Sequence, residues 1–169
     1  DKDKRPKDFR CTIHISDVVV DGYLYQLLNY FPVGDGAGRA FSQRYGIIGQ
    51  VWRSGAAQVV GNLFPGGPKP GATEAEKVKQ MVENWGMTAP EAQRALSKPS
   101  YACYPIKYSE RVIGLLYMDS TEEKAFADTD NDPALVKKNC DIISNWPLSA
   151  NLAKLVDALT GTKIGLPEN

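Results

Sequence analysis

The sequence predicts an α+β sandwich, in which a central and mostly antiparallel sheet of five strands is flanked by helices. Two observations lead to this fold class. Strand-like runs occur in the first third of the chain and again at 101–119, and two helix-start patterns separate these groups. Strands grouped in this way, with helices inserted between the groups and at the end, are typical of α+β domains.

The first group of strands begins with FRCTIHIS at 9–16, in which apolar and polar residues alternate and place His14 on the polar face. Asp21-Gly22 separates this strand from the apolar run 23–31, and Asp-Gly between two such runs is a strong hairpin signal. Because the second run has apolar residues at both odd and even positions, we expect both faces of this strand to be covered.

The segment RYGIIGQVWRSGAAQVVGNL at 44–63 holds four glycines and resembles a loop that binds phosphate or a nucleic-acid backbone. A Walker loop would need Lys and then Ser or Thr after its last glycine, and neither occurs. The two isoleucines between Gly46 and Gly49 favour burial over contact with phosphate. We therefore expect a short helix that begins at Gly49 and ends at Gly55, followed by a third short strand at 58–60.

Two helices are predicted between the two groups of strands. Capping-box patterns begin at Thr73 and at Thr88, where a Glu follows three residues later. Gly86 can end the first of these helices. The second helix is expected to run to about Lys98.

The second group of strands consists of two apolar runs at 101–108 and 111–119, joined by a short polar turn. The later run is apolar at nearly every position, as in a strand buried on both faces. A final helical stretch starts near Asp132, and Pro147 is expected to break or kink it. Beyond this proline the helix continues, and a role in dimerisation or partner contact would predict an exposed apolar stripe on it, formed by Leu148, Leu152, Leu155 and Leu159.

Charge and composition exclude several classes of partner. Twenty Lys and Arg residues balance twenty Asp and Glu residues, so no long-range field attracts nucleic acid. No apolar run approaches the roughly 18 residues that span a bilayer, so we expect no direct membrane insertion. The three cysteines are distant from one another in sequence, which favours reduced thiols and a cytoplasmic location.

The polar residues form no recognisable catalytic or metal-binding set. His14 is the only histidine, and a surface or packing role is favoured over contact with a ligand. Cys103 has no basic neighbour in sequence that would activate its thiol. The acidic segment 128–132 resembles a calcium loop, but Pro133 stands where such a loop needs glycine. We therefore expect neither catalytic residues nor a metal site.

Two segments taken together resemble the GAF domain. YGIIGQVWRSGAAQVVGNL, at 45–63, is similar to the stretch in which a glycine-bounded helix leads into the third strand and ends near a small polar residue, here Asn62. SYACYPIKYSERVIGLLYMDS, at 100–120, is similar to the late hairpin of that family. The resemblance implies a single domain within 1–169, with its core at about 9–159, and we expect it to be excised from a longer multidomain protein.

The resemblance also implies a small-molecule pocket on one face of the sheet. GAF domains are mostly regulatory modules attached to kinases, cyclases, phosphodiesterases or transcription regulators, and many form dimers through their terminal helices. Specialised branches have defining residues that do not occur here. The Asn-Lys…Phe…Asp-Glu signature of cyclic-nucleotide binders is missing, and Cys103 is followed by Tyr104, not by the His often found in bilin binders. Haem binding would depend on His14 alone, and the cysteines do not match the pocket set of free methionine sulfoxide reductases. The sequence therefore gives no support for haem, bilin or a metal, and the cofactor stays unknown.

The leading hypothesis is a non-catalytic sensory domain that binds a small molecule and relays the signal to an effector elsewhere in the parent protein, as a homodimer formed through terminal helices. Two alternatives stay open. One is a degenerate GAF module that serves dimerisation or contact with a protein partner, and the other is a thiol redox enzyme of the same fold that uses Cys103. The residues expected to contact the ligand are Arg39, Phe41, Arg44, Trp52, Asn62, Tyr101, Cys103 and Tyr117.

Overall fold

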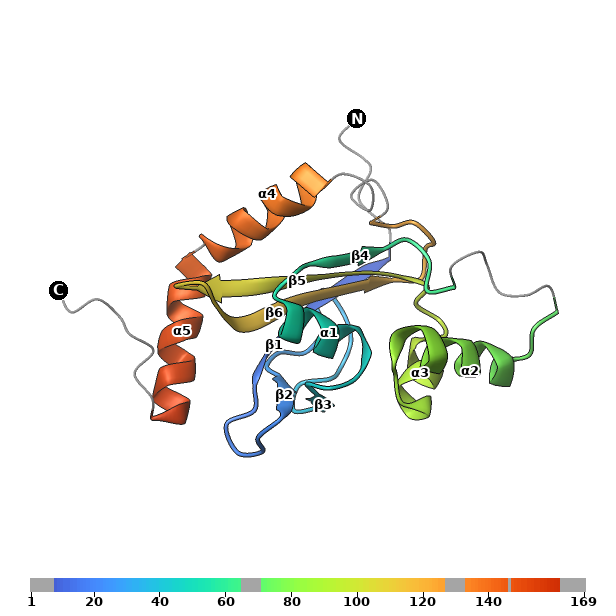
Figure 1. Cartoon of the computed structure of the whole chain (residues 1–169), viewed down its shortest axis with the longest axis horizontal. Helices are drawn as coiled ribbons and strands as arrows, with labels where there is room; N and C mark the ends of the chain where they lie inside the picture. Colours follow the sequence, from blue (N-terminus) through green and yellow to red (C-terminus); the bar gives the residue numbers. More distant parts are fainter. Residues whose placement is uncertain (1–7, 65–70, 127–132, 146, 162–169) are drawn as a thin grey trace.

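Six strands form one antiparallel sheet in the computed structural model, which describes residues 8–64, 71–126, 133–145 and 147–161. The strand order across the sheet is β3-β2-β1-β6-β5-β4, so the two long strands of the late hairpin lie at its centre. This architecture is the predicted α+β class (Figure 1). The strands are β1 (Phe9–Ser16), β2 (Tyr23–Gln26), β3 (Ala40–Ser42), β4 (Gln58–Val60), β5 (Ser100–Tyr108) and β6 (Arg111–Ser120).

The first half of the sheet differs from the prediction in two respects. The sheet has six strands and not five, because the three residues of β3 pair with β2 inside a glycine-rich segment that shows no alternation. The second strand ends at Gln26 and is covered on one face only, since Leu24 is fully buried whereas the side chain of Tyr23 is 42% exposed. The outward face of β2 therefore carries tyrosines where the apolar run predicted a covered surface.

Five helices complete the described part of the chain, and none of them is long and apolar enough to cross a membrane. Both capping boxes are formed as predicted, at the starts of α2 and α3, and Gly86 ends α2. The second of these helices stops at Ala95, a few residues before the predicted end. The break predicted at Pro147 is confirmed, because one helix ends at Ser144 and the next begins at Pro147. The helices are α1 (Gly46–Ser54), α2 (Glu74–Trp85), α3 (Ala89–Ala95), α4 (Pro133–Ser144) and α5 (Pro147–Thr160).

The short helix α1 begins at Gly46, three residues before the predicted start, and ends as predicted at Gly55. Gly46 has a φ of +66°, a conformation that glycine adopts without strain. Gly49 lies so close to the preceding loop that a Cβ atom would stand 2.9 Å from the carbonyl oxygen of Gln43. These two glycines let α1 start abruptly and pack tightly against the chain that leads into it.

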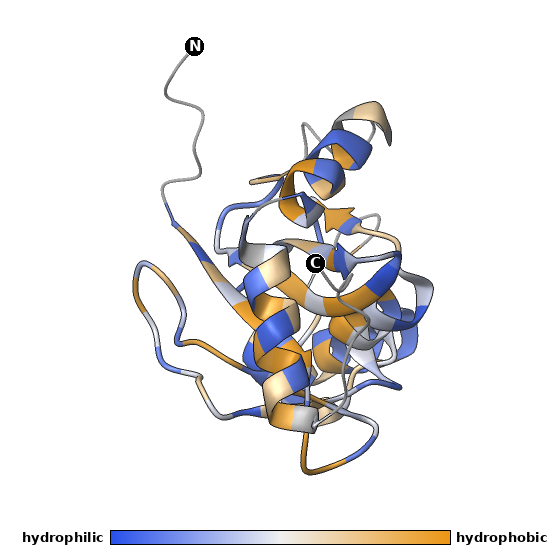
Figure 2. Cartoon of the chain, turned by 90° about the vertical axis from the view of Figure 1, so that its left-hand side faces the viewer, coloured by the Kyte–Doolittle hydropathy of each residue, from blue (hydrophilic) through white to orange (hydrophobic). Residues whose placement is uncertain are grey.

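The two faces of the sheet carry different helices. Figure 1 shows α4 on one side of the sheet and α1, α2 and α3 on the other. Alternation along β1 sends Ile13 and Ile15 to the side of α5, where they pack with Leu152, Ala153 and Val156. Figure 2 shows α5 in front of the sheet, with hydrophobic residues interleaved among hydrophilic ones. The opposite face of β1, which carries Arg10, Thr12 and His14, points toward the layer of α1 and α3.

Candidate functional site

A cleft with a volume of about 100 Å³ opens on the face of the sheet that carries α1 and α3. A single water occupies roughly 10 to 15 Å³ on this measure, so the cleft has room for a small molecule of several non-hydrogen atoms. Aromatic side chains form much of its wall, and the aromatic residues among its lining are Tyr30, Phe41, Tyr45 and Tyr117. The charged residues of the lining are Arg10, Arg39, Glu91, Arg94, Lys98 and Asp119.

Both carboxylates of the lining are already engaged. Asp119 of β6 is only 3% exposed and accepts hydrogen bonds of 2.7 and 3.1 Å from the guanidinium of Arg10, opposite it on β1. Arg10 also lies over the ring of Tyr30, with its guanidinium carbon 3.9 Å from the ring centroid. Glu91 accepts hydrogen bonds from the backbone N–H and the hydroxyl of Thr88 in the capping box of α3. Neither acid is therefore left without a positive or polar partner.

Arg39 is held by neutral partners and keeps an uncompensated charge. Its guanidinium donates to the side-chain oxygen of Gln26 at 3.1 and 2.9 Å and to the carbonyl oxygen of Gly36 at 3.2 Å. Gln26 is itself fully buried and donates to the carbonyl oxygen of Leu28 at 2.9 Å and to the hydroxyl of Thr12 at 3.3 Å. Within the described ranges no carboxylate pairs with Arg39, so its charge faces the cleft.

A second pair of cations stands on the α3 side. Arg94 is exposed in the last turn of α3 and has no carboxylate partner in the part of the chain that is described. Lys98 follows α3 and lies 3.5 Å from a carboxylate oxygen of Asp8. Lys98 is thus paired with a carboxylate, and Glu91 keeps its own charge because its partners are neutral, so the charges on the α3 side nearly balance and Arg39 supplies the net positive charge of the cleft. Guanidinium and ammonium groups placed in this way favour a small oxyanion as occupant.

His14 lies behind the cleft wall and is fully buried. Neither of its ring nitrogens has a hydrogen-bond partner among the described residues. Its ring meets that of Phe41 edge to face at a centroid distance of 5.0 Å, and that of Tyr117 at 6.1 Å. Burial, together with the charge of Arg39, lowers the pKa of His14 to about 3. Of the surface or packing role predicted for this histidine, the surface role is wrong because the polar face of β1 is covered, whereas the ring does pack against aromatic side chains.

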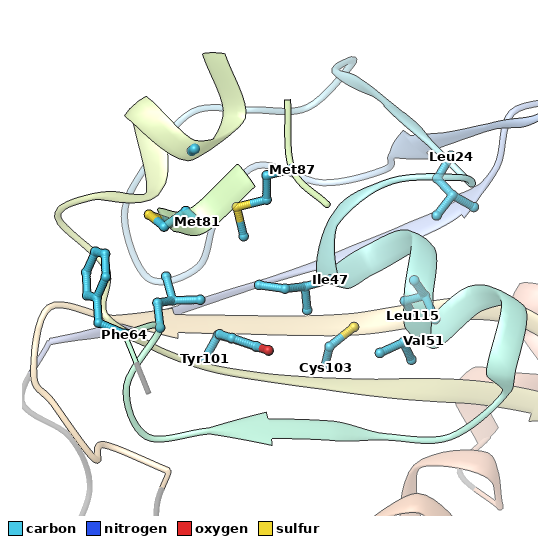
Figure 3. Close-up of a cluster of buried hydrophobic side chains, with 11 residues drawn as sticks. Leu24, Ile47, Val51, Phe64, Met81, Met87, Tyr101, Cys103 and Leu115 are labelled. Atoms are coloured by element: carbon cyan, nitrogen blue, oxygen red, sulfur yellow. The ribbon is translucent and has the colours of Figure 1, made fainter. Parts of the chain in front are cut away.

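The structure brings some of the predicted ligand-contacting residues together and separates others. Arg39, Phe41 and Tyr117 line the cleft. Arg44 is exposed outside it, and Asn62 accepts a hydrogen bond from the N–H of Phe64 at 2.8 Å. The remaining predicted residues belong to the hydrophobic cluster between the sheet and α1, in which Figure 3 shows Tyr101 and Cys103. These residues are Trp52, Tyr101 and Cys103.

Several residues of the cleft were not predicted from the sequence. Arg10 could have been predicted from the sequence, because it lies on the same polar face of β1 as His14. Asp119 follows the apolar run of β6, one residue before the strand ends, and it pairs in register with Arg10. Tyr30, Tyr45 and Arg94 come from loop or helix positions whose placement depends on tertiary packing.

The cysteines do not lie at the cleft. Cys103 is fully buried in the cluster under α1, and burial raises the pKa of its thiol well above the usual value. Cys11 and Cys140 are partly buried, and burial raises the pKa of each. All three thiols are free. Within the described ranges no group of three or more His, Cys, Asp or Glu side chains could hold a metal ion, and the acidic segment 128–132 lies outside those ranges.

The sequence matches no family model and no curated protein. Solved structures nevertheless share its fold. The GAF domain region of a putative membrane protein from Geobacter sulfurreducens PCA has a TM-score of 0.53 at 20% identity, over 88% of this chain and 82% of that chain. The GAF domain of an Acinetobacter phosphoenolpyruvate-protein phosphotransferase has a TM-score of 0.52 at 12% identity, over 88% of this chain and 73% of that chain.

A third similar structure is an enzyme. The type II free methionine-R-sulfoxide reductase from Thermoplasma acidophilum has a TM-score of 0.53 at 16% identity, over 94% of this chain and 85% of that chain. Likeness at these identities concerns the fold, which both regulatory and catalytic proteins use. The chain has a GAF-like fold, as the two sequence segments predicted.

Proposed function

We propose that this chain is a regulatory GAF-type domain that binds a small oxyanion in the cleft between the sheet and α3. The observation that carries the proposal is the charge of the lining, in which Arg39 is anchored by the neutral Gln26 and the nearby Asp119 is neutralised by Arg10. An arginine paired with a carboxylate would be neutralised. An arginine oriented by an amide stays charged and ready to form charge-assisted hydrogen bonds.

A binding role is favoured over catalysis by the place of the thiols. The thiolate is the reactive form of cysteine, and burial in apolar surroundings suppresses it. Cys103 is buried away from the cleft, and burial raises the pKa of its thiol. This observation counts against the thiol redox alternative, even though one similar structure is a reductase.

The signal would pass from the cleft to the far face of the sheet. Residues of β1 alternate between the cleft side, which holds His14, and the α5 side, which holds Ile13 and Ile15. An occupant that prefers one arrangement of the cleft walls would shift the population of states in which β1 and α5 are packed differently. The helix α5 would then carry the change to a neighbouring domain or subunit.

The test is a thermal-shift screen of small oxyanions, followed by titration calorimetry with succinate and inorganic phosphate. We expect a saturable increase in Tm for at least one of these anions and none for the cations choline and tetramethylammonium, which carry no oxyanion. A screen in which no carboxylate or phosphate binds would overturn the proposal. Arg111 lies exposed outside the cleft, so Arg111→Gln is the control for a loss of general surface charge.

Self-association is a second candidate function, favoured by exposed apolar residues on the two last helices. Ile142 is 54% exposed, and Leu155 and Leu159 are also exposed. The apolar stripe predicted on α5 is corrected at Leu152, which is buried against the sheet, and the side chain of Leu148 is outside the description. Sedimentation equilibrium of the chain and of Leu155→Asp tests this candidate, and a monomer at all concentrations would contradict it.

A further inference from the structure

The imidazole of His14 is buried without a hydrogen-bond partner among the described residues, which lowers the stability of the fold. A buried donor or acceptor without a partner costs about 1 to 3 kcal/mol, so native proteins rarely retain one that has no role. Here both ring nitrogens lack a partner among the described residues, and the side chain is fully buried. An apolar residue of similar size would fill the same space without this cost.

The surroundings of His14 connect it to the cleft. Its two aromatic neighbours, Phe41 and Tyr117, are themselves cleft residues. Opposite it on the neighbouring strands stand Gln26, which anchors Arg39, and Leu115. The charged group that acts on the imidazole of His14 is the guanidinium of Arg39. The ring of Phe41 is half-buried, lines the cleft and meets the imidazole edge to face.

We infer that His14 donates a hydrogen bond from a ring nitrogen to the oxyanion bound in the cleft, and that the Phe41 side chain turns aside to admit this contact. The inference rests on the proposed function. Arg39 holds one oxygen of the occupant from the side, and the neutral imidazole binds a second oxygen from below. The positive charge of Arg39 disfavours a proton on His14, and it also attracts the anion toward the N–H of the imidazole. His14 is therefore a specificity residue, because it favours an occupant that presents a second acceptor oxygen in addition to the one held by Arg39.

The sequence offers an unusually clean reporter, since His14 is the only histidine of the chain. We propose to record the ring nitrogens of ¹⁵N-histidine-labelled protein by NMR, with and without succinate or inorganic phosphate. The expected result is a downfield shift of one ring N–H that saturates with the calorimetric Kd. For phosphate, a coupling between that nitrogen and phosphorus would report the hydrogen bond directly.

Two variants supply an independent readout. His14→Leu removes the hydrogen bond and is expected to weaken binding by about tenfold, as one charge-assisted hydrogen bond does, while the Tm of the anion-free protein rises. Phe41→Ala removes the side chain that has to turn aside and is expected to strengthen binding, and weaker binding by a folded Phe41→Ala would contradict this part of the inference. A purely structural histidine would instead leave affinity unchanged on substitution, or lower Tm.

The outcomes separate the two proposals. Succinate or phosphate could bind without changing the chemical shift of the ring N–H, or could bind His14→Leu with unchanged affinity. Either result overturns the role of His14 and leaves the proposed function intact. Absence of binding by either anion overturns the proposed function, and this inference with it. If His14→Leu fails to fold, the NMR measurement on the wild-type chain decides alone.

Discussion

The guanidinium of Arg39 and the side-chain amide of Gln26 meet through two hydrogen bonds of 3.1 and 2.9 Å, with both acceptor contacts made to one oxygen. Gln26 is fixed in turn because its amide nitrogen donates to the carbonyl oxygen of Leu28 and to the hydroxyl of Thr12. The arginine is thus oriented by a rigid, uncharged group of the sheet. Orientation without neutralisation is what a preformed anion site requires, because little side-chain entropy is then lost on binding.

Replacement of this arginine tests the charge of the site. Arg39→Gln removes the charge and the bidentate fork, and we expect the Kd for the best-bound oxyanion to rise about 10- to 100-fold, since hydrogen bonds between charged groups contribute roughly 1.5 to 3 kcal/mol. Titration calorimetry measures the change. Arg44→Gln and Arg111→Gln alter exposed arginines outside the cleft and should each change the Kd less than about threefold. Equal losses in all three variants would contradict a specific role for Arg39.

The pH dependence of stability reports the burial of His14. Its pKa is about 3 in the folded chain and about 6.5 when unfolded, so the unfolded state binds the proton first as the pH falls. Stability is therefore lost between pH 6.5 and pH 3. From pH 7 to pH 5 this one group lowers the free energy of unfolding by about 2 kcal/mol.

The measurement for this prediction is urea denaturation of the wild-type chain and of His14→Leu at pH 7 and pH 5. Protonation of carboxylates affects both proteins alike, so the difference between their pH slopes isolates the histidine. We expect the leucine variant to lose about 2 kcal/mol less over this interval. Parallel slopes would mean that the imidazole is accessible to protons in the folded state.

The fold was more accessible from the sequence than the cleft, and the reason is physical. Capping boxes at Thr73 and Thr88, the helix end at Gly55 and the break at Pro147 are local signals, and each formed as predicted. The strand at Ala40–Ser42 has no such signal, because only pairing with β2 keeps it extended. Local sequence therefore determines where most elements start and stop.

The cleft is assembled by contacts between residues distant in sequence. Arg10 and Asp119 meet across two strands, more than a hundred positions apart in the chain. Aromatic residues near the glycine-rich motif, such as Trp52 and Tyr101, were expected to contact a ligand but pack into the cluster under α1. Aromatic character alone does not distinguish a core residue from a wall of the cleft, since both are apolar. The buried imidazole of His14 could be placed only once the covering of its strand face was known.

Asp119 gives a prediction in which stability and affinity change in opposite directions. Asp119→Asn keeps the shape of the side chain but removes the charge that compensates Arg10. We expect a loss of about 1 to 3 kcal/mol in the free energy of unfolding, because a buried charged hydrogen bond is weakened. We also expect the oxyanion to bind about threefold more tightly or better, since the cleft gains net positive charge. Denaturation and calorimetry measure the two effects, and weaker binding by a folded Asp119→Asn would contradict the charge argument.

The contact between β6 and α5 can be tested at Gly114. A Cβ atom at this position would lie 2.8 Å from a methyl carbon of Leu152 on α5 and 3.0 Å from the carbonyl oxygen of His14 on β1. Gly114→Ala should therefore push α5 away from the sheet and cost about 1 to 3 kcal/mol, as overpacking does in other cores. Hydrogen exchange should show faster exchange of amides in α5, while those of α2 stay protected. Leu155→Ala changes an exposed residue of the same helix and serves as the control, with an expected loss below about 1 kcal/mol. If α5 in Gly114→Ala keeps wild-type protection, the packing of this helix on the sheet does not depend on the close contact with β6.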